Sequence, residues 1–145
     1  MSAREVARAA RRAIEVARER VAGGDVLLLF AEGTRSRDAR MQAMLPGVAR
    51  YLDLPGLLIV PAGLCGSEAL FSVERSRLRR ARVTLELGSP IQADLLLEGA
   101  AGDRRLAMDA IGLAIAQLLP LPYRGIYEDA DRYPDARRLL QRTRS

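Results

Sequence analysis

The amino-acid sequence predicts an α/β fold in which helices flank a mostly parallel sheet. Three observations lead to this prediction. The 145 residues suffice for one domain, and 49% of them are hydrophobic, which allows a core. Short apolar runs typical of buried strands alternate along the chain with segments of helical periodicity. Such an alternation favours a parallel sheet with right-handed crossovers.

The first elements are a helix, a strand and a loop. A helix is expected over residues 3–22, because Ser2 and Glu5 have capping-box spacing and an apolar stripe with helical periodicity follows. The apolar run 26–30 predicts a buried strand. A polar loop follows over residues 32–40.

The middle of the chain predicts the second half of a βαβ unit. Pro46 suits the first turn of a short helix over 46–53. The run 57–60 then predicts a second buried strand, so that residues 26–60 would form a right-handed βαβ crossover. Alternating polar and apolar residues over 82–87 predict a strand with one wetter face.

The remaining segments are expected to be loop and helix. Residues 63–80 are rich in loop signals, with a short helix expected over 67–72. Asp103 is placed to cap a long helix that continues to Leu119 and is apolar enough to belong to the core. Residues 135–142 are expected to form a last helical piece.

The charge of the chain suits an anionic partner. The net charge is +5, all 23 basic residues are arginines, and there is no histidine. Such a surface attracts phosphate on a lipid headgroup, a membrane or a nucleic acid. No apolar run approaches the roughly 18 residues that cross a bilayer, and the single Cys65 cannot form an internal disulfide. We therefore expect a cytoplasmic protein, with no metal site because histidine is absent.

The densest basic cluster lies in the loop-rich segment. A solvated loop is the favoured interpretation, and contact with anionic lipid or with nucleic acid stays open. Nucleic acid is the less favoured partner, because aromatic residues make up 4% of the chain and no known nucleic-acid-binding motif is present. The cluster consists of Arg75, Arg77, Arg79, Arg80 and Arg82.

The loop after the first expected strand has the side chains of a phosphate site. It leaves the carboxyl end of a strand, where ligands bind in open α/β sheets. Gly33 permits a positive φ or a close backbone approach, Arg35 offers a planar fork of donors, and Thr34 and Ser36 add hydroxyls. Glu32 would orient Arg35 or accept a hydrogen bond from a substrate hydroxyl. By chemistry alone, an ordinary polar turn is the more frequent origin of such a segment.

The heptapeptide Phe-Ala-Glu-Gly-Thr-Arg-Ser closely resembles the F-P-E-G-T-R-S block of the glycerophospholipid acyltransferases. The likeness spans about residues 5–127, and its most specific piece is 30–38. Further matching segments are 46–49, 58–61 and 118–127.

The resemblance implies a 1-acylglycerol-3-phosphate acyltransferase-like domain over residues 1–127, followed by a polar, Arg-rich tail over 128–145. In that family a fatty acyl group passes from acyl-CoA or acyl-carrier protein to a lysophospholipid or glycerol phosphate, without a cofactor. Peripheral contact with the inner face of the cell membrane is implied, and no nucleic acid. This chain would supply the acceptor-binding site, with Arg35 on the phosphate. The implied site residues are Glu32, Gly33, Thr34, Arg35, Ser36 and Pro61.

The chain departs from the family in lacking the His-x-x-x-x-Asp block, because it contains no histidine. That histidine is the general base, a role typically worth about 10²–10⁴ in rate. Glu32 beside Arg35 would be a poor base, and Cys65 lacks the surrounding pattern of a nucleophile elbow. Met44-Leu45 stands where the family has Phe and a basic residue, so a second phosphate contact is expected to be missing.

No catalytic residue is therefore expected, and the chain alone is expected to be inactive. One hypothesis is an N-terminally truncated acyltransferase domain that needs a complementing N-terminal chain. Loss of the first strands would leave an uncovered sheet edge and an apolar face. The alternatives are a non-catalytic phosphate- or phospholipid-binding relative, and a small basic protein that binds a membrane surface or a nucleic acid.

Overall fold

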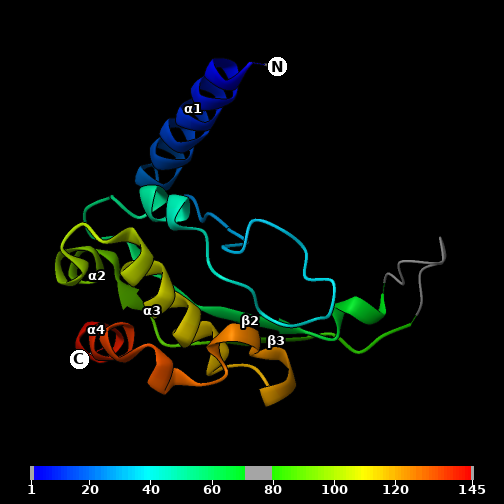
Figure 1. The fold of residues 1–145 in the computed structure, drawn as a ribbon. Helices are drawn as coiled ribbons and strands as arrows, with labels where there is room; N and C mark the ends of the chain where they lie inside the picture. Colours follow the sequence, from blue (N-terminus) through cyan, green and yellow to red (C-terminus); the bar gives the residue numbers. More distant parts are fainter. Residues whose placement is uncertain (1, 71–79, 145) are drawn as a thin grey trace.

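The computed structural model describes residues 2–70 and 80–144, and Figure 1 shows their arrangement. These ranges are rich in helix and contain two separate two-stranded antiparallel sheets. The predicted mostly parallel sheet flanked by helices is therefore wrong. Within the described residues, no helix is both long and apolar enough to cross a membrane.

The first helix, α1 (Ala3–Ala22), confirms the prediction from the capping box. The hydroxyl of Ser2 accepts a hydrogen bond from the amide of Glu5 at 3.3 Å, and the Glu5 carboxylate accepts from the Ser2 amide at 2.5 Å. Figure 1 shows α1 projecting away from the other helices, beside the short 3₁₀ helix η1 (Pro46–Tyr51) at its C-terminal end. Much of its apolar stripe is therefore exposed to solvent, as at Val6.

The predicted buried strand over 26–30 is absent, and its residues are exposed and belong to no helix or strand. Val26 is 96% exposed, Leu28 74% and Phe30 73%. A strand requires a neighbour that accepts and donates its backbone hydrogen bonds, and no described segment pairs with this run. The apolar composition of residues 26–30 predicted that they would be buried. Burial requires another segment that packs against them, and the described part of this fold provides none.

The four strands that do form pair antiparallel in two units. β1 (Leu58–Ile59) pairs with β4 (Ile91–Gln92), and β2 (Ala62–Cys65) pairs with β3 (Thr84–Leu87). The predicted crossover over 26–60 is absent, because its first strand does not form and its second is an antiparallel strand of two residues.

The β2–β3 unit has one apolar face toward solvent. Its register sets Leu64 opposite Leu85, and both lie on the same face as Leu87. These three leucines are 42%, 61% and 64% exposed. The other face approaches the end of the longest core helix, where Gly63 has Leu118 and Leu119 as neighbours. All four residues of β3 are exposed, so the single wetter face expected of this strand is not observed.

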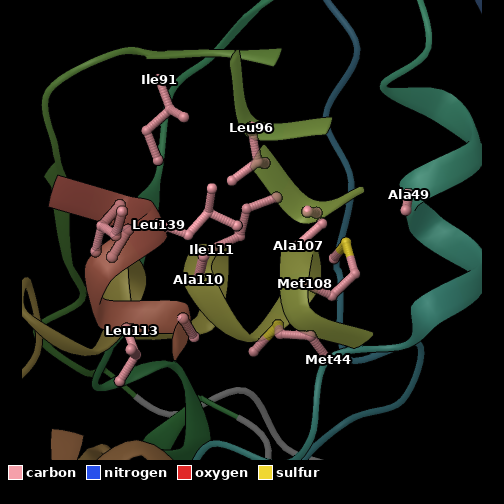
Figure 2. Packing of buried hydrophobic residues seen from close by; sticks show 14 of the residues in the cluster. Met44, Ala49, Ile91, Leu96, Ala107, Met108, Ala110, Ile111, Leu113 and Leu139 are labelled. Carbon is pink, nitrogen blue, oxygen red and sulfur yellow. The ribbon is translucent and has the colours of Figure 1, made fainter. Parts of the chain in front are cut away.

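The core lies between three helices, α2 (Ala93–Ala100), α3 (Arg104–Ala116) and α4 (Pro134–Thr143). The predicted cap of α3 is confirmed, because the Asp103 carboxylate accepts from the Leu106 amide at 3.0 Å. Figure 2 shows α3 at the centre of this cluster, with side chains from α2 and α4 around it. The buried residues of α4 are Ala136, Leu139, Leu140 and Thr143.

Short 3₁₀ helices complete the chain between these elements. η1 replaces the longer helix predicted over 46–53, and η2 (Ser67–Ala69) lies within the helix predicted over 67–72. Residues 71 and 72 of that prediction lie outside the described ranges. The last three are η3 (Leu121–Tyr123), η4 (Gly125–Tyr127) and η5 (Ala130–Arg132).

Gly112 on α3 leaves the space that the Tyr127 ring occupies, so Gly112→Ala is expected to destabilise the fold. A Cβ at this position would lie 2.5 Å from Cζ of Tyr127. We expect a loss of about 1–3 kcal/mol in unfolding free energy, measured by urea denaturation followed by circular dichroism. Gly47→Ala is the matched control, because a Cβ there meets no atom within 4 Å. An equal effect of both substitutions would contradict this packing.

Candidate phosphate-binding loop

The candidate loop, residues 31–45, is closed at its base by two hydrogen bonds. The Leu45 amide donates to the Ala31 carbonyl at 2.8 Å. The Glu32 carboxylate accepts from the Gln42 amide, also at 2.8 Å. One oxygen of Glu32 is therefore engaged in holding the loop closed. The sequence had suggested that Glu32 would orient Arg35 or accept a substrate hydroxyl, and this structural task was not foreseen.

Gly33 adopts a positive φ, which is one of the two roles that the sequence left open for it. Its φ is +68°, and its amide donates to the Phe30 carbonyl at 3.0 Å. A Cβ here would overlap Cδ1 of Leu45, which packs against the glycine from the other side of the loop. Glycine is thus required by both the backbone conformation and the available space.

The tip of the loop presents polar side chains to solvent. Thr34 and Arg35 are exposed, and Ser36 is half-buried. The Ser36 hydroxyl donates to the Asp38 carboxylate at 2.8 Å, and the Arg40 amide donates to the same oxygen at 3.1 Å. These bonds, the Ser36 hydroxyl first, lower the pKa of Asp38. An anion at the tip would therefore compete with the Asp38 carboxylate for the Ser36 hydroxyl.

The charges of the loop still favour an anion. Residues 32–40 carry three arginines and two carboxylates, so the segment has a net charge of +1. One of the arginines is partly neutralised, because Arg40 pairs with Glu128 at 3.1 Å. Arg35 and Arg37 are exposed to solvent. The two carboxylates take part in hydrogen bonds that hold the loop.

The far side of the loop is clamped to the 3₁₀ helices near the C-terminus. The Met41 amide donates to the Tyr123 carbonyl at 2.8 Å, and the Met41 carbonyl accepts from the Ile126 amide at 3.2 Å. Gly125, with φ +52°, lies so close to this carbonyl that a Cβ would collide with it. The loop is therefore fastened by its backbone to a separate part of the chain.

A buried polar cluster lies beneath the loop. The Tyr127 hydroxyl donates to the Asp109 carboxylate at 2.7 Å and accepts from the Met44 amide at 3.1 Å. Arg105 donates to the Met44 carbonyl at 2.6 Å and lies 3.4 Å from Asp109. Burial first, and then Asp109, raises the pKa of Tyr127. Sequence reasoning missed this cluster; the only signal was the likeness of residues 118–127 to the acyltransferases.

Pro61 does not belong to this loop by any hydrogen bond of the described residues. It is buried in the core, and its carbonyl accepts from the Gly88 amide at 2.8 Å, next to the β2–β3 unit. The structure thus keeps Glu32, Gly33, Thr34, Arg35 and Ser36 together in one loop and places Pro61 in a different unit.

Two cavities lie elsewhere on the protein. One of 720 Å³ is lined by α1 and residues 25–27, and one of 550 Å³ lies between α1, η1, α2 and the start of α3. Neither is lined by residues 32–36. Thr34 and Arg35 of the candidate loop lie at the exposed surface instead.

The other candidate groups are scattered. Cys65 is a half-buried free thiol on β2. Arg80 and Arg82 are exposed, whereas Arg75, Arg77 and Arg79 lie outside the described residues. Within residues 2–70 and 80–144, no group of three or more possible metal ligands is present.

The comparisons with known proteins identify no relative. No family model, no curated protein and no solved structure matches this chain. The resemblance of residues 30–38 to an acyltransferase block therefore stays a prediction from the sequence.

Tyr127→Phe is expected to destabilise the protein, because it leaves the Asp109 carboxylate and the Met44 amide without their shared hydroxyl. The expected cost is about 1–3 kcal/mol near neutral pH. Since the folded state raises the pKa of Tyr127, this contribution is fully present below the unfolded pKa near 10 and is lost as the pH rises through the folded value. Urea denaturation of both proteins from about pH 7 to 11 should show their difference shrinking above about pH 10. A difference that grew with pH would contradict the assignment.

Proposed function

We propose that residues 32–36 bind the phosphate of a glycerol phosphate or lysophospholipid acceptor. In this proposal the chain is the acceptor-binding part of an acyltransferase that uses acyl-CoA or acyl-carrier protein as donor. The fatty acyl group would lie in the membrane surface that the basic protein contacts peripherally. The proposal starts from the likeness of residues 30–38 to the family block.

The observation that carries the proposal is the combination of a fastened loop with an exposed tip. Glu32 and Leu45 close the base, and Met41 is clamped at the far side, while Thr34 and Arg35 stay exposed. A guanidinium on such a loop meets a phosphate with little further loss of conformational freedom. Gly33 supplies the positive φ that this turn needs.

Binding without transfer is the behaviour proposed for the chain alone. Acyl transfer breaks the thioester C–S bond, forms an ester C–O bond and requires that the acceptor hydroxyl lose its proton. This chain has no histidine to take that proton. A complementing polypeptide would have to supply the base; without one, the chain acts as a phosphate- or phospholipid-binding protein.

Arg35→Ala is expected to weaken acceptor binding strongly. Loss of a hydrogen bond to a charged group typically costs about 1.5–3 kcal/mol, which corresponds to a Kd raised about 10- to 150-fold. Isothermal titration calorimetry with sn-glycerol 3-phosphate measures this change at low salt. Arg132→Ala is the matched control, an exposed arginine on η5 whose loss should leave the Kd unchanged.

Further measurements distinguish acceptor binding from general attraction to a basic surface and from nucleic-acid binding. If Arg35→Ala and Arg132→Ala weaken binding equally, the proposal fails and general attraction to a basic surface explains the affinity. If a short DNA duplex binds more tightly than sn-glycerol 3-phosphate and is insensitive to Arg35→Ala, the basic nucleic-acid-binding alternative is favoured. Incubation with acyl-CoA and acceptor should yield no acylated product from the chain alone.

A further inference from the structure

The exposed run 26–30 has the alternating exposure of a strand but pairs with no described segment. Exposure alternates along it, at 96% for Val26 and 74% for Leu28 but 40% for Leu27 and 37% for Leu29. Among the described residues, none of its amides donates to another group, and only the Phe30 carbonyl accepts a hydrogen bond. The run is therefore an exposed apolar segment whose backbone donors and acceptors are available, apart from the Phe30 carbonyl.

Unpaired apolar strands are an association hazard that folded proteins usually cover. Exposed edges are commonly blunted by charge, proline or a bulge. The segment from Val26 to Phe30 carries none of these: its five residues are uncharged, and none is proline. Nothing in its own sequence would oppose the addition of another strand.

The surface of the chain is large for its size. Its solvent-accessible area is 10266 Å², whereas a compact monomer of 15.9 kDa is expected to expose about 7,400 Å². A stable interface buries about 800 Å² on each partner. The excess of observed over expected accessible area is several times the area that one partner buries in such an interface. The leucine face of β2–β3, with Leu64, Leu85 and Leu87, adds a second apolar surface that an associated chain would cover.

We propose that residues 26–30 pair with the same residues of a second copy of this chain. The proposed arrangement is an antiparallel two-fold seam centred on Leu28, in which Val26 faces the Phe30 of the second copy and Leu27 faces its Leu29. Pairs of aromatic and β-branched side chains across strands are favourable. The run is self-complementary in this register because it has no charge to repel its own copy.

The charges at the ends of the run favour a protein partner over an anionic membrane. Asp25 precedes the run, and its carboxylate pairs with Arg20 at 2.6 Å. Glu32 follows the run and binds the Gln42 amide. Acidic residues therefore flank the segment on both sides, which disfavours its insertion among anionic headgroups. In the proposed register Asp25 faces Ala31 of the second copy, so no like charges meet.

The mass of the purified chain in solution tests association. Light scattering coupled to size exclusion should give twice 15.9 kDa at micromolar concentrations. Leu28→Glu sets two carboxylates opposite each other at the centre of the seam, so it should return the mass to one chain. Leu121→Glu is the matched control, because Leu121 is 58% exposed on η3, away from the seam, and this variant should stay dimeric.

Cysteine cross-linking tests the register and does not depend on the mass. In a Cys65→Ser background, Leu28→Cys should form an intermolecular disulfide on mild oxidation, because residues opposite each other in antiparallel strands lie within bonding range. Val26→Cys should not form this disulfide, because in the proposed register residue 26 faces residue 30 of the second copy, and the two cysteines lie four residues apart along the strands. Thermal unfolding followed by circular dichroism checks that each variant is folded.

Each other outcome overturns the proposal. If the measured mass is that of one chain at every concentration, residues 26–30 do not pair with a second copy. If the Leu28→Glu variant is still a dimer, the interface lies elsewhere on the protein. If both cysteine variants cross-link equally, the association is unspecific. If the chain is a monomer that co-floats with anionic vesicles, the apolar surface binds lipid and not a second copy. The proposal does not rest on phosphate binding: it is judged by mass and cross-linking, and the proposed function by acceptor affinity.

Discussion

Two hydrogen bonds of the Tyr127 hydroxyl join three distant parts of the chain, and they fix the end of the candidate loop at Met44. Asp109 lies on α3, Tyr127 ends η4, and the same hydroxyl accepts the amide of Met44 in the loop. Figure 2 shows the Met44 side chain reaching into the buried cluster beside α3. Because Arg105 also donates to the Met44 carbonyl, both backbone groups of this residue are satisfied inside the protein.

The elements that the sequence predicted well are those whose signals are local. The capping box at Ser2 and Glu5 and the cap at Asp103 each place a helix start from residues three positions apart. The positive φ of Gly33 belongs to the same class, because it follows from one residue in one turn. The polar cluster beneath the loop was missed because Arg105, Asp109 and Tyr127 are brought to Met44 only by tertiary packing.

The predicted parallel sheet failed for the opposite reason. A strand forms only where a neighbouring strand pairs with it. An apolar run such as 26–30 indicates that its side chains favour burial, but it does not indicate which segment would cover them. Its composition, apolar on both faces, is that of a strand covered on both sides. The same applies to α1, whose caps and periodicity specify a helix but leave much of its apolar stripe in solvent. Local preference and tertiary contact therefore disagree in the first thirty residues.

This disagreement lies next to the candidate site, and the two are coupled through one residue. Phe30 ends the exposed run, and its carbonyl accepts the amide of Gly33 inside the loop. The far side of the loop is held by Met41 and Met44 in contacts with the core, but the near side continues directly into the unpaired segment. A partner that pairs with residues 26–30 would therefore lie directly beside the candidate loop. The candidate loop and the apolar run are therefore joined through the Phe30 carbonyl, while the bond between Leu45 and Ala31 closes the loop at this end.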